Sequence, residues 1–222
     1  MTAAAIEATD LYRFYHAGDD ETLALRGVSI AAAAGEIVAV LGPSGSGKST
    51  LMACLAGLDE PDGGSVRVGG SRMTRRPEGE RDALRAKSIG ILLQFGNLID
   101  GLTVRDNMRL QLRLAGIAGD ERIVPALQSV GLGTRADSRP NQLSGGEAAR
   151  AALALVLAHD PLVLLADEPT GNVDAATEQI VLDVLRARAR AGGAAILATH
   201  SAAVAAIAHR VVHLRDGRIA GV

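Results

Sequence analysis

The sequence predicts an α/β protein in which a mostly parallel, doubly wound sheet carries an antiparallel β subdomain at its edge and an inserted α-helical subdomain. Apolar runs of strand length alternate with segments of helical spacing through most of the 222 residues, an order typical of a parallel sheet covered by helices. A glycine-rich loop at 42–49 follows one such run and leads into a helical pattern. Residues 103–140 keep helical spacing without a strand signal, which indicates a helical insertion.

In the first half of the chain, the predicted strands surround the glycine-rich loop. Five runs with strand character lie at 6–15, 25–32, 37–41, 65–68 and 88–94. Turns are expected at 16–20 and 61–64, where glycine and aspartate cluster. The glycine-rich loop leads into a helix over 50–55, and the charge-rich segment 75–87 predicts a solvated helix or loop.

In the second half, helices dominate until two buried strands appear. Helices are predicted at 103–117, 121–130, from the loop 140–147 to about 158, at 177–190 and at 201–208. Gly131 stands where a helix C-cap glycine belongs. The fully apolar runs 162–166 and 194–198 are typical of strands buried in a parallel sheet. A final strand pair over 211–222 turns at Asp216-Gly217, which is a strong hairpin signal.

The loop Gly42-Pro43-Ser44-Gly45-Ser46-Gly47-Lys48-Ser49 matches the P-loop pattern G-x-x-x-x-G-K-[ST] between a strand and a helix. Its glycines allow backbone N–H groups to converge on phosphate oxygens, and the helix N-terminus adds a partial positive charge. Lys48 supplies a full charge near the β- and γ-phosphates, and the Ser49 hydroxyl is suited to Mg²⁺. We include Thr50 in the same predicted nucleoside triphosphate site. A glycine-rich turn that matches by chance is the alternative, and the strand–loop–helix context argues against it.

Two adjacent carboxylates, Asp167 and Glu168, end the apolar strand at 162–166. In an open α/β sheet, ligands bind at this carboxyl end of the strands. Alternate residues of a strand point to opposite sides, so the two carboxylates can take different roles. Asp167 is predicted to hold the Mg²⁺ shell and Glu168 to polarise the attacking water as a general base. An acidic turn before Pro169 is the simpler interpretation, which the neighbouring phosphate loop disfavours.

A second anion-binding pattern lies at Leu143-Ser144-Gly145-Gly146-Glu147, a serine and two glycines at a predicted helix N-terminus. One phosphate loop already serves a single site. The second pattern therefore suggests a shared site in which one chain completes the other's.

Composition excludes several other classes. The net charge is −2, so no basic field implies nucleic acid as a partner. No apolar run approaches the roughly 18 residues of a membrane span, and Met1–Asp10 lacks the basic start and apolar core of a signal peptide. The single cysteine, Cys54, excludes an internal disulfide and fits a reducing compartment.

These motifs together resemble the nucleotide-binding subunit of an ATP-binding cassette (ABC) transporter over about 6–218. Seven motifs stand in the family's order: Tyr15 (the aromatic that stacks on adenine), Gly42–Ser49 (Walker A), Gln94 (Q-loop), Leu143–Glu147 (signature), Leu162–Glu168 (Walker B), Asp174 (D-loop) and His200 (switch histidine). The resemblance implies one ABC ATPase domain over 1–222. Within it, 1–93 and 160–222 would form a RecA-like core with the β subdomain, and about 95–158 the helical subdomain.

The resemblance also implies roles for single residues. Glu168, His200 and Gln94 would serve hydrolysis, with Gln94 beside Mg²⁺ and His200 on the γ-phosphate. Mg²⁺ would be held by Ser49, Gln94 and Asp167. Two chains would form a head-to-tail dimer with two ATP molecules between them, each completed from the partner by the residues Ser144, Gly145, Gly146, Glu147 and Asp174.

The stacking aromatic residue has alternatives, and the helix after the signature motif departs from the family's pattern. Tyr12 and Phe14 lie close enough to Tyr15 to supply the stacking ring instead, or all three could cover a core edge. After the signature, family members often carry a glutamine and a second arginine where this chain has Ala149 and Leu155. That departure puts in question whether polar side chains of this helix act on the nucleotide bound to the partner chain.

Further segments narrow the resemblance to the subgroup of lipoprotein-release, macrolide-export, antimicrobial-peptide-export and cell-division subunits. They are 56–61, 94–98, 102–107 and 167–174. The subgroup implies a peripheral ATPase on the cytoplasmic face of the inner membrane, with permease subunits on separate chains. A slow-turnover nucleotide switch and a soluble ATPase acting on DNA or ribosomes are the alternatives. The presence of a single cassette and the absence of a heptad run disfavour the soluble ATPase. The signature loop excludes a P-loop kinase.

Overall fold

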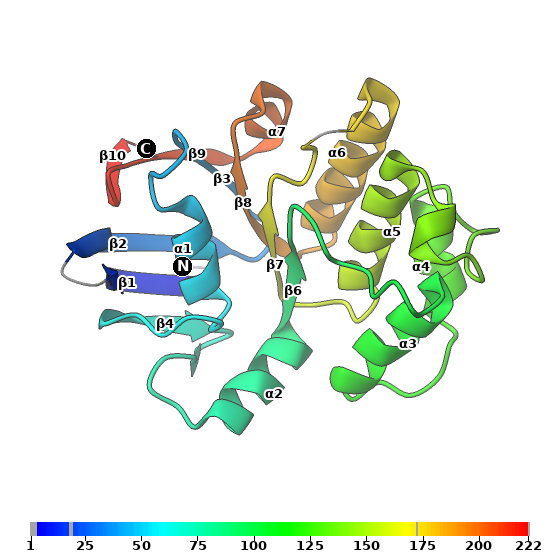
Figure 1. The fold of residues 1–222 in the computed structure, drawn as a ribbon, viewed down its shortest axis with the longest axis horizontal. Helices are drawn as coiled ribbons and strands as arrows, with labels where there is room; N and C mark the ends of the chain where they lie inside the picture. Colours follow the sequence, from blue (N-terminus) through cyan, green and yellow to red (C-terminus); the bar gives the residue numbers. More distant parts are fainter. Residues whose placement is uncertain (1–3, 18–19, 172, 222) are drawn as a thin grey trace.

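The computed structural model describes residues 4–17, 20–171 and 173–221, and it contains two sheets with helix α1 (Lys48–Leu55) between them (Figure 1). One apolar core joins the inner faces of both sheets to Leu51, Met52, Cys54 and Leu55 of α1. The α/β fold with a mostly parallel sheet and an antiparallel edge subdomain is therefore confirmed.

The larger sheet has six strands in the order β10-β9-β3-β8-β7-β6. Their bounds are β3 Ile37–Leu41, β6 Ile89–Leu92, β7 Val163–Asp167, β8 Ala194–Thr199, β9 Arg210–Arg215 and β10 Arg218–Gly221. All neighbours are parallel except the hairpin β9–β10. Because helices or the second sheet cover both faces, β7 and β8 are almost continuously apolar and buried, as their sequence predicts.

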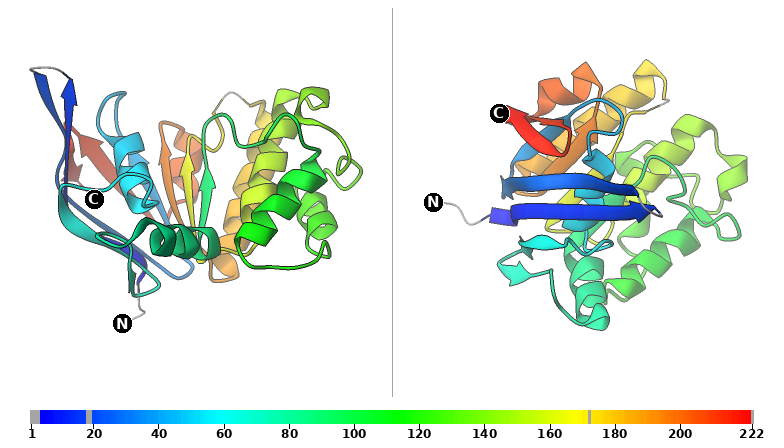
Figure 2. Two further views of the ribbon diagram at one scale, coloured as in Figure 1. Left: turned by 60° about the horizontal axis from the view of Figure 1, so that its bottom comes forward. Right: turned by 60° about the vertical axis from the view of Figure 1, so that its left-hand side comes forward.

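The smaller sheet is antiparallel, in the order β2-β1-β4-β5, with β1 Ala4–Ala17, β2 Asp20–Ala33, β4 Gly63–Val68 and β5 Ser71–Arg72. The hairpin β1–β2 is longer than predicted: both strands continue into the expected turn at 16–20, and Gly18 and Asp19 of that turn lie outside the described residues. Figure 2 shows it as a long ribbon along one side of the molecule. The two-residue strand β5 was not predicted, because Ser-Arg carries no periodic signal.

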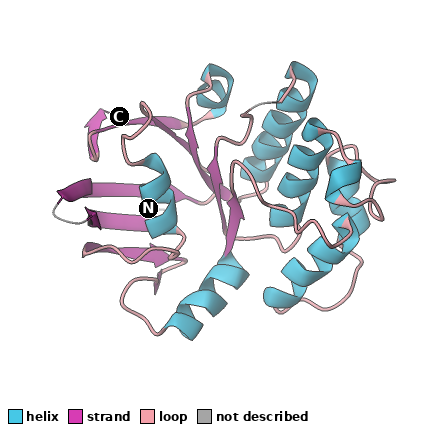
Figure 3. Ribbon diagram, in the orientation of Figure 1, coloured by secondary structure: helices cyan, strands magenta, loops and turns pink. Residues whose placement is uncertain are grey.

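The opposite face of the parallel sheet packs against helices α5 (Gly145–Leu157), α6 (Ala175–Arg190) and α7 (Ala202–Ile207) (Figure 3). Their N-caps are Ser144, Asp174 and Ser201, each of which accepts a backbone N–H of the first turn. Helix α2 (Glu78–Ser88) has no buried residue, so of the predicted solvated helix or loop the structure has the helix. It extends through Ser88, which the sequence placed in the following strand.

The helical insertion consists of α3 (Val104–Leu114) and α4 (Ile123–Ser129), packed on one side of α5 around a separate apolar core. Gly131 follows α4 with φ +73°, the left-handed conformation of a C-cap glycine. Leu155 is 7% exposed and belongs to this core. An arginine at this position of α5 would be buried among apolar side chains, so the departure at Leu155 is a matter of core packing in this chain.

Gly64 allows a close backbone approach at the start of β4. It has φ +88°, and a Cβ atom there would meet the carbonyl oxygens of Thr9 and Asp10 on β1. We predict that Gly64→Ala lowers the free energy of unfolding by about 2–3 kcal/mol, since it combines left-handed strain of about 1 kcal/mol with a backbone clash. Chemical denaturation measures the change.

Gly70→Ala is the matched control, because Gly70 has φ +76° but open space around its Cβ position. Gly70→Ala should lower the free energy of unfolding only by the backbone strain, about 1 kcal/mol. Equal losses in the two variants would show that the approach of β1 does not require Gly64.

Candidate functional site

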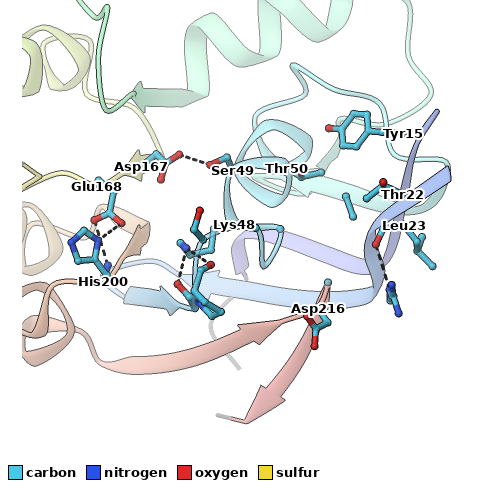
Figure 4. Close-up of a pocket in the computed structure, with 18 of the residues that line it drawn as sticks. Tyr15, Thr22, Leu23, Lys48, Ser49, Thr50, Asp167, Glu168, His200 and Asp216 are labelled. Carbon is cyan, nitrogen blue, oxygen red and sulfur yellow. Dashed lines mark hydrogen bonds and ion pairs between the residues drawn. The ribbon is translucent and has the colours of Figure 1, made fainter. Parts of the chain in front are cut away.

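A cavity of about 880 Å³ lies where the phosphate loop, the carboxyl ends of β7 and β8 and the strand pair β1–β2 meet (Figure 4). Its lining includes most of the phosphate loop and every catalytic and metal-binding residue predicted from the sequence: Tyr15, Gly42, Pro43, Ser44, Gly45, Gly47, Lys48, Ser49, Thr50, Gln94, Asp167, Glu168 and His200. The fold thus brings together residues from distant parts of the chain on one surface.

The phosphate loop joins β3 to α1 with α1 beginning at Lys48 and Gly47 as its N-cap. Gly47 has φ +103°, and a Cβ atom on it would lie 2.6 Å from the carbonyl oxygen of Ala24. The Lys48 ammonium donates hydrogen bonds to the carbonyl oxygens of Gly42 (2.7 Å) and Pro43 (3.1 Å). The loop therefore curls around the lysine and presents its charge to the cavity.

Ser49 and Asp167 form the oxygen cluster expected for a magnesium ion. The Ser49 hydroxyl donates a hydrogen bond of 2.8 Å to Asp167 Oδ2, although the residues are 118 positions apart. Mg²⁺ prefers oxygen ligands and usually takes one or two carboxylates together with substrate phosphates and water. Within the described residues, no group of three or more carboxylate, histidine or cysteine side chains could enclose a metal by itself. The residues present thus fit an ion that arrives with a phosphate ligand.

Glu168 is the most constrained carboxylate in the cavity. Its carboxylate accepts hydrogen bonds from the Thr199 hydroxyl (2.9 Å) and contacts His200 Nδ1 at 2.7 Å. The Glu168 side chain is 12% exposed, whereas His200 is 79% exposed. Glu168 also has φ +50°, a strained conformation for a residue with a side chain, and such strain often accompanies function. The end of β8 thus holds the carboxylate rigidly at the cavity wall.

Of the three clustered aromatic residues, Tyr15 lines the cavity, whereas Tyr12 and Phe14 do not. The Tyr12 ring instead packs over Gly27 and Gly63 within the antiparallel sheet. Tyr15 is 38% exposed, and its hydroxyl donates a hydrogen bond of 2.7 Å to Asp59. Position in the cavity favours Tyr15 over its two neighbours as the residue that stacks on a base.

The signature residues lie elsewhere on the chain and do not line the cavity. Ser144 caps α5 in a reciprocal pair with Glu147: the Ser144 hydroxyl accepts from Glu147 N–H at 3.2 Å, and Glu147 accepts from Ser144 N–H at 2.9 Å. The backbone N–H of Ser144, with Arg135 assisting, holds the pKa of Glu147 below its usual range. Glu147 is therefore a charged capping residue here.

Asp174 similarly caps α6, accepting from Thr177 N–H at 2.7 Å. This backbone hydrogen bond lowers the pKa of Asp174. Arg150 reaches from α5 to the Thr177 hydroxyl at 2.8 Å, which ties the two helices together. Asn172, in the same predicted motif, lies outside the described residues.

Sequence reasoning missed the part of the cavity wall that comes from β2 and the β9–β10 turn: Thr22, Leu23, Ala24, Arg26, Asp216 and Gly217. The Gly217 N–H donates to the carbonyl oxygen of Ser46 at 3.0 Å, so the C-terminal hairpin supports the phosphate loop directly. The Asp216-Gly217 turn was visible in the sequence as a hairpin, but nothing in the pattern showed which loop it would touch.

The geometry defines a P-loop ATPase site, and comparisons with known proteins place it in a family. Residues 25–171 match the family model described as ABC transporter. An uncharacterised ABC transporter ATP-binding protein of Thermotoga maritima is 40% identical over 98% of this chain and 94% of the relative. The chain belongs to the ABC transporter family and is an ABC-type ATPase.

Relatives with more specific names also match. The lipoprotein-releasing system ATP-binding protein LolD of Legionella pneumophila is 38% identical over 99% of this chain and 98% of the relative. The macrolide export ATP-binding/permease protein MacB of Chlorobium phaeobacteroides is 40% identical over 96% of this chain, which spans about 33% of that longer protein.

Among solved structures, the bacterial ABC transporter cassette MJ0796, described as dimeric, superposes with a TM-score of 0.92 at 32% identity, covering 97% of both chains. A second structure of that cassette, in a post-hydrolysis state bound to ADP and Pi, gives a TM-score of 0.91. Within the described residues of the present chain, no helix is at once long enough and apolar enough to cross a membrane.

We predict that Tyr15→Ala weakens the binding of ATP and GTP alike, by up to about a hundredfold, because a base–aromatic stack contributes roughly 1–3 kcal/mol and tolerates either base. Titration with fluorescent analogues of both nucleotides measures the effect. Tyr12→Ala is the control and should leave both affinities within about twofold. Unchanged affinity in Tyr15→Ala would exclude stacking on this ring.

Proposed function

We propose that this chain binds and hydrolyses ATP as the energy-supplying subunit of a membrane-embedded export or mechanotransmission complex of the lipoprotein-release and macrolide-export type. The arrangement around Glu168 carries this proposal. A carboxylate fixed by Thr199 and His200 shares one cavity with Lys48 and with the Ser49–Asp167 oxygen pair. The similarity to LolD and MacB supports the choice of complex.

In the proposed reaction, the phosphate loop and Lys48 hold the triphosphate and stabilise charge on its outer oxygens. Glu168 accepts a proton from a water molecule as the water oxygen attacks the γ-phosphorus, and ADP leaves with phosphate as the second product. Thr199 and His200 hold Glu168 in place, and the exposed face of His200 is free to contact the γ-phosphate. Gln94, which also lines the cavity, would orient the water.

Mg²⁺ would be held by Ser49 and Asp167, with Gln94 as a further oxygen ligand. When bound, the ion would neutralise charge on the β- and γ-phosphates.

We further propose that the complete site forms between two copies of the chain in a head-to-tail dimer. The signature residues Ser144 to Glu147 form an intact, capped helix N-terminus that is suited to an anion but lies outside the chain's own cavity. Asp174, at the N-terminus of α6, would complete the same interface. The dimeric MJ0796 cassette supports this arrangement.

Permease subunits on other chains are the proposed membrane partners, which would place the ATPase on the cytoplasmic face of the inner membrane. Three exposed apolar residues lie close to Gln94 in the sequence: Leu93, Phe95 and Ile99, of which Phe95 is 70% exposed. Exposed apolar side chains in a segment that also reaches the catalytic cavity are suited to a protein partner whose docking alters hydrolysis. A slow nucleotide switch, as in cell-division complexes, would use the same surface and differ only in turnover.

Glu168→Gln should retain ATP binding while lowering the hydrolysis rate by about 10²–10⁴, because the amide cannot accept the proton. The bound ATP should then trap a dimer that elutes as one species in size-exclusion chromatography. Phosphate release under single-turnover conditions measures the rate. Asp183→Asn, on the outer face of α6, is the control for removal of a carboxylate. Normal hydrolysis by Glu168→Gln would contradict the assignment of the general base.

A mixing experiment tests the shared site. Lys48→Ala damages the phosphate half and Ser144→Arg the signature half, so each variant alone should be inactive. In a mixed dimer, one of the two sites contains both intact halves. We therefore expect ATP hydrolysis to reappear when equal amounts are combined, at up to about a quarter of the wild-type rate if each intact site acts alone. No recovery, together with full activity of Ser144→Arg by itself, would show that one chain suffices.

A further inference from the structure

A network of charged residues outside the cavity lining holds the Tyr15 side chain in place. The Tyr15 hydroxyl donates to Asp59 Oδ2 at 2.7 Å, and Arg13 Nη2 lies 2.8 Å from Asp59 Oδ1. The Arg13 guanidinium also lies 4.7 Å from the centre of the Tyr15 ring and pairs with Asp62 at 3.1 Å. One carboxylate, Asp59, therefore binds both the tyrosine and the arginine stacked on it.

The position of Tyr15 in the sheet explains why it needs such an anchor. Strand β4 pairs with β1 only as far as Tyr12, opposite Gly63, whereas β1 and β2 stay paired to Ala17 and Asp20. Tyr15 thus stands on a two-stranded ribbon beyond the edge of the four-stranded sheet. A ribbon of two strands is at best marginally stable without further packing.

The loop between α1 and β4 takes the place of the missing third strand. Asp62 accepts the backbone N–H of Phe14 at 2.8 Å, and the Asp62 N–H donates to Tyr12 O at 2.9 Å. Asp59 N–H donates to the carbonyl oxygen of Ala53, near the end of α1. Since α1 begins at Lys48, a short rigid path connects the phosphate loop to the Tyr15 ring.

The electrostatics keep this network charged. Burial opposes ionisation of Asp59, but the hydrogen bonds from Arg13 and Tyr15 outweigh it and hold the pKa of Asp59 below its usual range. Burial and the bond to Asp59 raise the pKa of Tyr15, so its hydroxyl remains a donor. The Arg13 and Asp59 side chains are only 21% and 24% exposed, which limits screening by solvent.

We propose that Asp59 is a positioning residue for recognition of the nucleotide base, with Arg13 as its second partner. Asp59 fixes the Tyr15 hydroxyl and the guanidinium on one face of the ring, which leaves the other face for the base. It holds this ring at a set distance from the phosphate loop through α1. The inference rests on the proposed stacking role of Tyr15 and extends it to two residues outside the cavity lining.

The test compares Asp59→Ala in the full-length chain with wild type, using ATP, GTP and inorganic tripolyphosphate as probes. We expect the dissociation constants of ATP and GTP to rise by about 5- to 30-fold, which corresponds to the loss of about 1–2 kcal/mol. Tripolyphosphate should bind within about twofold of wild type, because the phosphate loop is untouched. In steady-state hydrolysis, KM for ATP should rise while kcat should not fall.

Glu60→Ala provides a matched control from the same loop. Glu60 also pairs with an arginine, Arg81 at 2.7 Å, and its carboxylate accepts the Arg75 N–H rather than the Tyr15 hydroxyl. It should leave all three affinities within about twofold. Tyr15→Phe keeps the ring and removes only the bond to Asp59. Its effect should be smaller than that of Asp59→Ala, and the double variant should lose less than the two single losses combined.

The outcomes separate this inference from the proposed function. If Tyr15→Ala does not weaken ATP binding, the stacking role itself fails. If Tyr15→Ala weakens it but Asp59→Ala does not, the ring needs no anchor and the inference fails alone. Equal losses for ATP and tripolyphosphate in a folded Asp59→Ala protein, checked by its circular dichroism and thermal melting, would overturn it too, because Asp59 would then act through the phosphate loop.

Discussion

The nucleotide site depends on three backbone segments that approach more closely than side chains would allow. A Cβ atom on Gly42 would overlap the carbonyl oxygen of Leu214 in β9, and Cβ atoms on Gly47 and Gly217 would each lie 2.6 Å from the carbonyl oxygen of Ala24 in β2. The phosphate loop is thus held between a strand of the antiparallel sheet and the C-terminal hairpin. Glycine at these positions determines where the loop lies as well as how it curls. Its N–H groups are thereby fixed in place before any phosphate arrives, which is the condition for electrostatic preorganisation.

The parallel sheet supplies the second requirement, which is to gather polar side chains at one edge. Strands β6, β7 and β8 end side by side, so Gln94, Asp167 and His200, which follow or end them, meet although they are far apart in sequence. The same edge produces the strained backbone at Glu168, whose N–H donates to the carbonyl oxygen of Ala198 while its carboxylate returns to Thr199. The buried apolar strands therefore form a rigid base, and the reactive groups occupy their ends.

The sequence was sufficient for the elements with strong local signals and insufficient for contacts between them. The phosphate loop and the apolar strands β7 and β8 are encoded by neighbouring residues, and the structure has them where they were expected. The continuation of β1 to Ala17 depends on pairing with β2, which no local pattern specifies. The support of the phosphate loop by Gly217 and of Tyr15 by Asp59 are tertiary contacts between segments 171 and 44 residues apart. Their residue types, a turn glycine and a loop aspartate, are too common to indicate such partners.

The distribution of polar groups fits the proposed site shared between two chains, in which the signature helix of one chain completes the cavity of the other. Lys48, Ser49 and Asp167 already satisfy one another or nearby carbonyl groups, so this half is structured before nucleotide binds. The signature helix is equally complete, because Glu147 satisfies the Ser144 N–H and Arg135 balances its charge. Two preformed halves that lie apart within one chain require little local rearrangement to assemble between two chains. The free-energy cost of forming the closed dimer is then mainly the cost of associating two chains. A triphosphate that contacts both halves would offset this cost with its binding energy. Nucleotide binding would thus control dimer formation, and hydrolysis would release it.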